Sequence, residues 1–172
     1  MKIDCKTIAE EMKQNIVRKC QGKDLKFGIV QVGDNQASNA YIKGKMKDCA
    51  EVGIEVSLFK YHESISQSSL AEKINFLVRS RTLNGLIIQL PLPPHLDINV
   101  LSKIIPNKMD VDNLRGDSPF VPATPKGILM LMDYLGEEFA GRHVVMIGRS
   151  KIVGEPMAAL ALMRDATVTV CH

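Results

Sequence analysis

Short apolar runs that alternate with helix-like segments constrain the fold of this 172-residue chain more than any other feature. The runs are rich in β-forming residues and cover residues 25–32, 56–61, 86–90, 143–148 and 167–171. Segments with apolar residues at helical intervals precede and separate them, at residues 8–20, 36–52, 68–80, 98–105, 124–135 and 153–164. Strands that alternate with helices favour right-handed crossovers and parallel sheets with helices on both faces. The pattern therefore predicts an α/β fold.

Prolines and glycines mark the ends of several of these elements. Gly136 predicts the end of a helix that Thr124 caps and that has Pro125 at its first helical position. Pro91 ends the third strand and leaves Gln89 near the carboxyl end of that strand. Open α/β sheets bind their ligands at this end of their strands, so Gln89 is a candidate site residue.

Charge and hydropathy make several kinds of partner improbable. The 22 Lys and Arg residues exceed the 19 Asp and Glu residues by only +3, and they are spread along the chain, so we expect no nucleic-acid partner. No apolar run reaches the roughly 18 residues that a membrane-spanning helix needs. The N-terminus is also too charged for a signal peptide. We therefore expect a cytoplasmic protein without a membrane partner.

The four cysteines lie far apart in the sequence, at Cys5, Cys20, Cys49 and Cys171. They show none of the C-x-x-C spacings that are typical of zinc and redox sites. We expect free thiols in a reducing compartment and no bound metal.

The first candidate site is the pattern Ser38-x-x-Tyr41-x-x-x-Lys45. On a helix, steps of three and four residues place these side chains on one face, where a hydroxyl, an aromatic ring and an amine converge. The alternative is a half-buried tyrosine beside a solvated lysine. Gln89 has a similar alternative, because a polar amide in an apolar strand needs hydrogen-bond partners that are either a ligand or the backbone of a nearby loop.

Asp110 and Asp112 form a second candidate pair, on a loop rich in Asp, Gly and Pro. A calcium loop needs more oxygen ligands at fixed offsets, so a carboxylate that accepts hydrogen bonds from a ligand's N–H groups is the simpler functional interpretation. The alternative is a cap on a turn or a helix.

The third candidate is the glycine-containing segment from Gly148 to Pro156, between a predicted strand and a predicted helix. Glycine lets the backbone approach a phosphate, and a helix start offers free N–H donors. Arg149, Ser150 and Lys151 add positive charge and a hydroxyl group. The segment lacks the three glycines of G-x-G-x-x-G, so it is only a partial dinucleotide motif.

Together these segments resemble the bifunctional methylenetetrahydrofolate dehydrogenase/cyclohydrolase family. The motifs SNAYIKGK, GLIIQLPLPP, DVD, PATPKGI and VVMIGRSKIVGEPM occur in the family's order, and the resemblance covers nearly the whole chain. The chain departs from the family at Asn113, where glycine is usual, and at Ala123, where cysteine is usual. The loop between Asp112 and Pro122 is also shorter than in the family.

The resemblance implies a two-domain α/β enzyme of one-carbon folate metabolism. Residues 1–122 would form a parallel-sheet catalytic domain, and residues 123–172 would form the first part of a Rossmann-type domain that binds NADP, with folate between the two. The implied reactions are NADP-dependent oxidation of methylenetetrahydrofolate to methenyltetrahydrofolate and hydrolysis of that product to formyltetrahydrofolate. The resemblance also implies a homodimer.

The resemblance assigns a role to each candidate residue. The implied substrate-binding residues are Ser38, Tyr41, Pro91 and Asp112, and the implied cofactor-binding residues are Gly148, Arg149, Ser150, Val153 and Gly154. Tyr41 would stack on the folate, and Asp112 would hydrogen-bond the pterin. Lys45 and Gln89, with Tyr41 beside them, would form the catalytic centre of the hydrolysis step. Arg149 suits the additional phosphate of NADP.

The sequence ends at His172, where the second strand of the Rossmann half ends, whereas family members continue. We therefore expect this chain to bind folate but to have little dehydrogenase activity. We also expect exposed apolar surface at residues 144–147 and 168–171 to promote association. Two alternatives remain open: an NADP oxidoreductase similar to shikimate dehydrogenase, and a truncated folate-binding module without enzyme activity.

Overall fold

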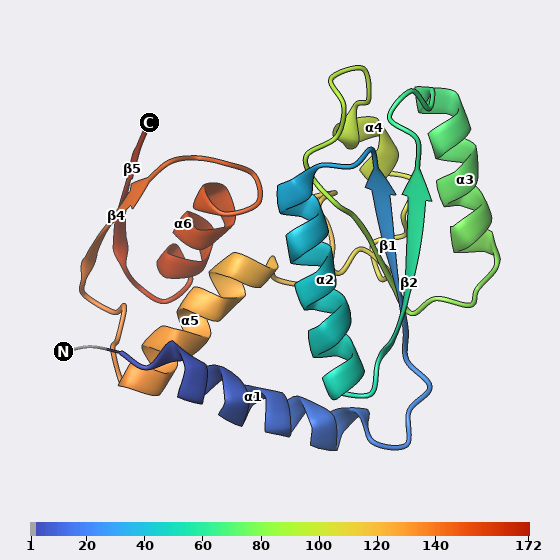
Figure 1. Ribbon diagram of the computed structural model, residues 1–172. Helices are drawn as coiled ribbons and strands as arrows, with labels where there is room; N and C mark the ends of the chain where they lie inside the picture. Colours follow the sequence, from blue (N-terminus) through green and yellow to red (C-terminus); the bar gives the residue numbers. More distant parts are fainter. Residues whose placement is uncertain (1–2) are drawn as a thin grey trace. The chain divides into compact units, whose positions relative to one another are not determined.

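The computed structural model describes residues 3–172, and the chain divides into two compact units, Met1–Met109 and Asp110–His172. Each unit has a parallel sheet and helices, so the predicted α/β class is confirmed (Figure 1). The division assigns the loop at 110–122 to the second unit, whereas the sequence-based boundary follows that loop. The boundary at 122/123 stays a prediction. None of the helices formed by residues 3–172 combines the length and apolar character needed to cross a bilayer.

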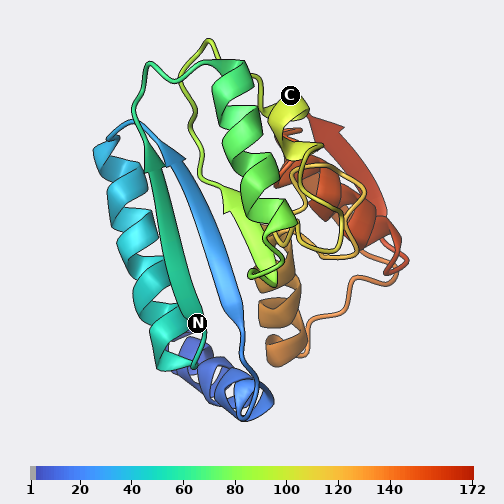
Figure 2. The ribbon, with the colours of Figure 1, turned by 90° about the vertical axis from the view of Figure 1, so that its right-hand side faces the viewer.

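The first unit is a three-stranded parallel sheet with helices on both faces. Its elements are α1 (Cys5–Cys20), β1 (Lys26–Val32), α2 (Gln36–Glu51), β2 (Glu55–Tyr61), α3 (Gln67–Arg79), β3 (Gly85–Ile88) and α4 (Ile98–Ser102). The strand order is β2-β1-β3, so the two crossovers run in opposite directions from one strand to the next. Right-handed crossovers in opposite directions place their helices on opposite faces. Figure 2 shows this arrangement, with α2 and α3 on either side of the strands.

The core of the first unit lies between β1, β3 and the helices that cover them. Its fully buried side chains are Ile29, Val30, Leu70, Ile74, Leu86, Ile88, Leu101 and Ile105. On the outer edge of β3, the backbone N–H of Leu86 donates to the carbonyl of Met109 at 2.8 Å. The chain therefore returns along this edge of the strand. This contact satisfies a backbone group that an open strand edge would leave unpaired.

An ion pair between helices ties α1 to α2. Lys13 Nζ donates to Asp48 Oδ1 at 3.1 Å and also to the carboxylate of Glu51. Both bonds raise the pKa of Lys13 above its ordinary value, the bond to Glu51 contributing most. The start of α1 is capped by Asp4, whose carboxylate accepts the N–H of Lys6 at 3.1 Å. The helix therefore has a capped start and a fixed position on the first unit.

The second unit is smaller and consists of α5 (Ala123–Leu135), β4 (His143–Ile147), α6 (Gly154–Leu162) and β5 (Thr167–Cys171). Its buried core cluster is Leu129, Phe139, Met157, Ala161 and Ala166, against which Met132, Val144, Met146, Leu160 and Val168 pack. The sequence predicted exposed apolar surface at residues 144–147 and 168–171, and only some of these side chains are exposed. Val145, Ile147 and Val170 are at least half exposed, with Ile147 at 86%. Association through this surface stays a prediction.

Some predicted element ends were wrong by a few residues. The strand β3 ends at Ile88, and Gln89 follows it, although the Gln89 N–H still donates to the carbonyl of Val30 at 2.8 Å. Thr124 is not an N-cap, because α5 already begins at Ala123 after an N-cap at Pro122. Proline inside the first turn is tolerated there, since its missing N–H has no partner within the helix. The predicted stop of α5 at Gly136 is confirmed, with a left-handed backbone at φ +68°.

The core predicts unequal effects of two truncations on α3. Ile74 is fully buried, whereas Phe76, two residues later, is 71% exposed. We expect Ile74→Ala to lower the free energy of unfolding by about 2–5 kcal/mol. The matched control Phe76→Ala should change it by less than about 0.5 kcal/mol, although it removes a larger side chain. Urea unfolding followed by circular dichroism measures both, and equal losses would contradict this description of the core.

Candidate functional site

The topology of the first sheet brings the first two candidate motifs together. The chain passes from β1 through α2 to β2 on one side, and then crosses to β3 on the other side of β1. The carboxyl ends of β1 and β3 therefore flank a topological switch point, where open α/β sheets bind ligands. The helix α2 starts just after β1, and Gln89 comes directly after β3.

A hydrogen bond joins Lys45 to Gln89 at this switch point. Lys45 Nζ donates to Gln89 Oε1 at 3.1 Å, and both side chains are half-buried. The other end of the Gln89 amide, Nε2, donates to the carbonyl oxygen of Leu90 at 2.8 Å. Because both ends of the amide have partners, its orientation is fixed with the oxygen toward the lysine. The sequence predicted that both residues lie in one site, and the structure places them in contact.

Ser38 reaches the same Leu90 carbonyl from α2. Its Oγ donates to that oxygen at 3.3 Å, and its N–H donates to the N-cap residue Asn35 at 3.0 Å. The side chain is only 4% exposed. Ser38 therefore holds the backbone group that orients Gln89, and its predicted contact with folate stays a prediction.

Tyr41 and Pro91 lie in more open positions. Tyr41 is on α2, about one turn before Lys45, and is 69% exposed, so a flat ligand has access to its ring. The alternative of a half-buried tyrosine beside a solvated lysine is wrong, because Tyr41 is exposed and Lys45 is half-buried. Pro91 is exposed and follows Leu90 through a cis peptide bond.

In the second unit, the loop after residue 109 uses its first aspartate as a turn cap. The Asp110 carboxylate is fully buried and accepts the backbone N–H groups of Leu114 at 3.1 Å and Arg115 at 2.9 Å. Asn113 has a left-handed backbone with φ +52°, which asparagine tolerates better than most residues other than glycine. Asp112 is half-buried, and its role toward the pterin stays a prediction.

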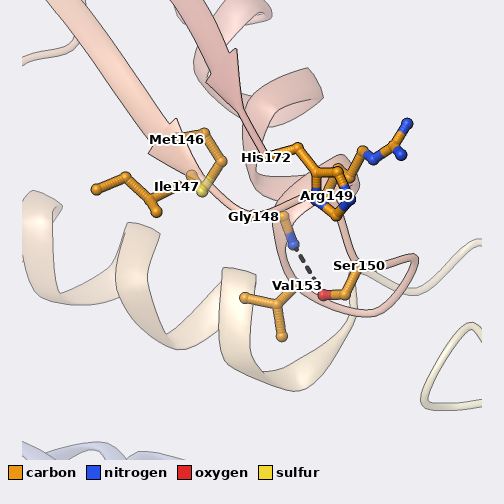
Figure 3. A pocket seen from close by; sticks show the side chains of 8 residues that line it. Met146, Ile147, Gly148, Arg149, Ser150, Val153 and His172 are labelled. Atoms are coloured by element: carbon orange, nitrogen blue, oxygen red, sulfur yellow. Dashed lines mark hydrogen bonds between the residues drawn. The ribbon is translucent and has the colours of Figure 1, made fainter.

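The glycine segment forms a concave site of about 530 Å³ at the carboxyl ends of β4 and β5 (Figure 3). All the predicted cofactor residues line it, namely Gly148, Arg149, Ser150, Val153 and Gly154. His172 also lines the site, although the sequence analysis did not identify it. It directly follows β5, and the rule that neighbouring parallel strands end at the same edge of a sheet could have identified it.

Close backbone packing shapes this loop. A Cβ atom on Gly154 would lie 2.2 Å from the carbonyl oxygen of Gly148, which is a forbidden contact. Gly148 itself has φ +108°, a conformation that favours glycine. The loop therefore requires glycine at both positions.

The predicted free N–H donors at the start of α6 were wrong. The N–H of Gly154 donates to Ser150 Oγ at 3.4 Å, the bond marked by the dashed line in Figure 3. The N–H of Glu155 donates to the Ser150 carbonyl at 3.0 Å. Pro156 has no N–H, and Met157 donates to Val153 within the helix. The oxygens of Ser150 therefore accept the first two N–H groups of α6. The exposed guanidinium of Arg149, which extends away from the loop, is available to attract an anion.

The cysteines and the other potential metal ligands form no metal site within residues 3–172, because no three such side chains cluster. All four cysteines are free. Burial is the main reason that the pKa of the Cys49 thiol is raised above its ordinary value.

Comparison with known proteins shows similarity along the whole described chain. A family model described as tetrahydrofolate dehydrogenase/cyclohydrolase, catalytic domain, matches residues 3–112, and the NAD(P)-binding domain of the same family matches residues 122–172. A protein named Bifunctional protein FolD from Geobacillus thermodenitrificans is 40% identical over 97% of this chain. Another with that name from Thermodesulfovibrio yellowstonii is 41% identical over 99%. The chain spans 62% and 64% of the lengths of these two relatives.

Solved structures show the same relationship. The bifunctional enzyme FolD from Campylobacter jejuni superposes with a TM-score of 0.90 at 34% identity, over 96% of this chain and 64% of that one. The Trypanosoma brucei dehydrogenase-cyclohydrolase, solved with NADP cofactor and inhibitor, has a TM-score of 0.90 at 27% identity, over 100% of this chain and 64% of that one. Because a family model matches well over half of its residues, the chain belongs to the tetrahydrofolate dehydrogenase/cyclohydrolase family.

Proposed function

We propose that this chain acts in one-carbon folate metabolism, where it binds methylene- and methenyltetrahydrofolate and hydrolyses the methenyl form. The observation that carries this proposal is the 3.1 Å hydrogen bond between Lys45 and Gln89 at the switch point of the first sheet. The exposed ring of Tyr41, about one turn away, supports it, because a folate contains flat aromatic groups that can stack on such a ring. The chain spans 57–65% of the lengths of these relatives, so their dehydrogenase activity comes to it only as a proposal.

In the proposed hydrolysis, water attacks the methenyl carbon and opens the ring to the formyl product. Lys45, acting as a neutral amine, removes a proton from the attacking water and gives it to the ring nitrogen whose bond to that carbon breaks. The remaining hydroxyl proton leaves to solvent as the formyl C=O bond forms. Gln89 Oε1 orients the amine, since its own amide is held by the Leu90 carbonyl.

The residues of the second unit fit a dinucleotide of the NADP class. The close approach of Gly154 to the Gly148 carbonyl leaves no room for a Cβ atom at position 154, and Arg149 offers a planar guanidinium that pairs well with a phosphate monoester. When bound, NADP would accept the hydride that leaves the methylene bridge. Gly148, Arg149, Ser150, Val153 and Gly154 would hold it.

The remaining assignments follow from family membership and stay proposals. Asp112 anchors the pterin by charge-assisted hydrogen bonds, and Pro91 with Ser38 completes the folate site. The chain forms a homodimer. A cytoplasmic location is consistent with the four free cysteines.

A titration tests the proposed function. Calorimetry with methenyltetrahydrofolate should give saturable binding, whereas shikimate, the substrate class of the alternative oxidoreductase, should give none. Binding of shikimate without folate would overturn the proposal.

Lys45→Met should abolish the hydrolysis while leaving folate binding largely intact. General base catalysis contributes about 10²–10⁴-fold to a rate, so the rate above the uncatalysed background should fall by at least a hundredfold. Methionine keeps the length of the side chain and removes the amine. Lys47→Met, on the exposed side of the same helix, is the control and should retain the rate. Near-normal hydrolysis by Lys45→Met would remove Lys45 from the mechanism.

Gly154→Ala should weaken NADP binding by at least tenfold, because the new methyl group displaces the Gly148 carbonyl and the loop with it. Gly127→Ala is the matched control, since a Cβ at Gly127 meets nothing within 4 Å. In the α5 helix it should raise stability by about 0.5–1 kcal/mol and leave binding unchanged. Fluorescence titration with NADP measures both variants, and equal affinities would contradict the proposed loop geometry.

Arg149→Ala should reduce the preference for NADP over NAD. A guanidinium pairs with a phosphate monoester but gains little from a ribose hydroxyl. The affinity for NADP should therefore fall about tenfold or more, while the affinity for NAD changes little. Lys151→Ala serves as a neighbouring-charge control. An unmodified chain that already prefers NAD would contradict this assignment.

A further inference from the structure

A chain of polar side chains links the start of α2 to both neighbouring strands. Gln31 Nε2, from β1, donates to Asn39 Oδ1 at 2.7 Å. Asn39 Nδ2 donates in turn to Asp34 Oδ1 at 2.9 Å, and Lys60 Nζ, from β2, donates to the same oxygen at 2.5 Å. These bonds join two strands, the loop after β1 and the helix that carries the candidate site.

One end of this series of hydrogen bonds is buried and the other is exposed. Gln31 is 2% exposed, and an amide buried in this way destabilises the fold unless it is hydrogen-bonded. Asn39 supplies the acceptor for its Nε2. At the other end Asp34 is an acceptor only, because bonds from Lys60 first and Asn39 next lower its pKa below the ordinary value. The Asn39 amide therefore accepts the N–H of Gln31 with its oxygen and donates to the Asp34 carboxylate with its nitrogen.

Asn39 is the direct neighbour of Ser38, whose hydroxyl meets the Leu90 carbonyl. A shift of the first turns of α2 would move Ser38 away from that oxygen and release one of the two donors on it. The other donor is the Gln89 amide, which faces Lys45. The geometry of the catalytic pair therefore depends on where the start of α2 is held.

We infer that Asn39 is a positioning residue, which holds α2 between Gln31 and Asp34 so that Ser38 and the Leu90 carbonyl orient Gln89 toward Lys45. Asn39 acts through these residues and has no contact with the reacting atoms in this role. The inference rests on the proposed function for the reaction it serves, but the positioning itself is a property of the free chain.

An exchange of two side chains tests the inference. Asn39→Asp keeps the size of the side chain and the acceptor for Gln31, but it places a carboxylate against the carboxylate of Asp34. The double variant Asn39→Asp with Asp34→Asn restores a donor opposite an acceptor, with the direction of that bond reversed. Lys47→Ala, on the exposed side of α2, is the control.

The main measurement is the side-chain amide resonance of Gln89 in ¹⁵N-labelled chain, assigned by its absence in Gln89→Leu. Asn39→Asp should shift this resonance, and the double variant should return it to the original position. Affinity for methenyltetrahydrofolate should fall about fivefold or more in Asn39→Asp and recover in the double variant. A role limited to stability would lower the unfolding midpoint without moving the resonance.

The possible outcomes separate the two proposals. An unchanged Gln89 resonance in folded Asn39→Asp overturns the inference. A folded double variant in which the resonance is not restored also overturns it. If Asn39→Asp does not fold, the double variant becomes the test, and a double variant that does not fold or does not show the original resonance overturns the inference. A resonance that shifts and recovers supports the inference even where the original chain binds no folate, and in that case the proposed function alone has failed.

Discussion

The candidate site of the first unit depends on one backbone carbonyl, that of Leu90. It receives Ser38 Oγ from α2 and Nε2 of Gln89 from the adjoining residue. Because these two donors share the oxygen, the position of the helix and the orientation of the amide are coupled. With Nε2 held in this way, the Gln89 amide turns its oxygen toward Lys45. A single acceptor thus determines which atom meets the amine.

The fold places these groups together by topology rather than by sequence proximity. Lys45 and Gln89 are 44 positions apart, and they meet because α2 follows β1 while Gln89 follows the neighbouring strand β3. The same rule applies in the second unit, where the Gly148 loop and His172 lie at the ends of paired strands. Parallel sheets therefore build both candidate sites at the carboxyl ends of their strands.

Periodicity and turn residues were enough to predict every strand and helix of residues 3–172. The spacing of apolar residues in each segment fits either a helix or a strand, and turn residues mark where most segments end. Contacts between side chains distant in sequence were harder to predict. The spacing of Ser38 predicts a ligand contact, which stays a prediction, but it gave no sign of the bond to the Leu90 carbonyl. The N–H donors expected to be free at the start of α6 bond to oxygens of Ser150. In both cases a serine bonds to backbone groups, and a pattern of residue types does not reveal that choice.

In the proposed mechanism, Lys45 and Gln89 act as one unit through their hydrogen bond. A double-mutant cycle with Lys45→Met and Gln89→Leu tests it most directly, with the rate of methenyltetrahydrofolate hydrolysis as the quantity measured. Coupled neighbours show interaction energies of about 0.5–3 kcal/mol. If the two side chains act as one unit, the double variant is no slower than the slower single variant. Losses that add fully in the double variant would show that the two side chains act independently and would contradict the proposed coupling.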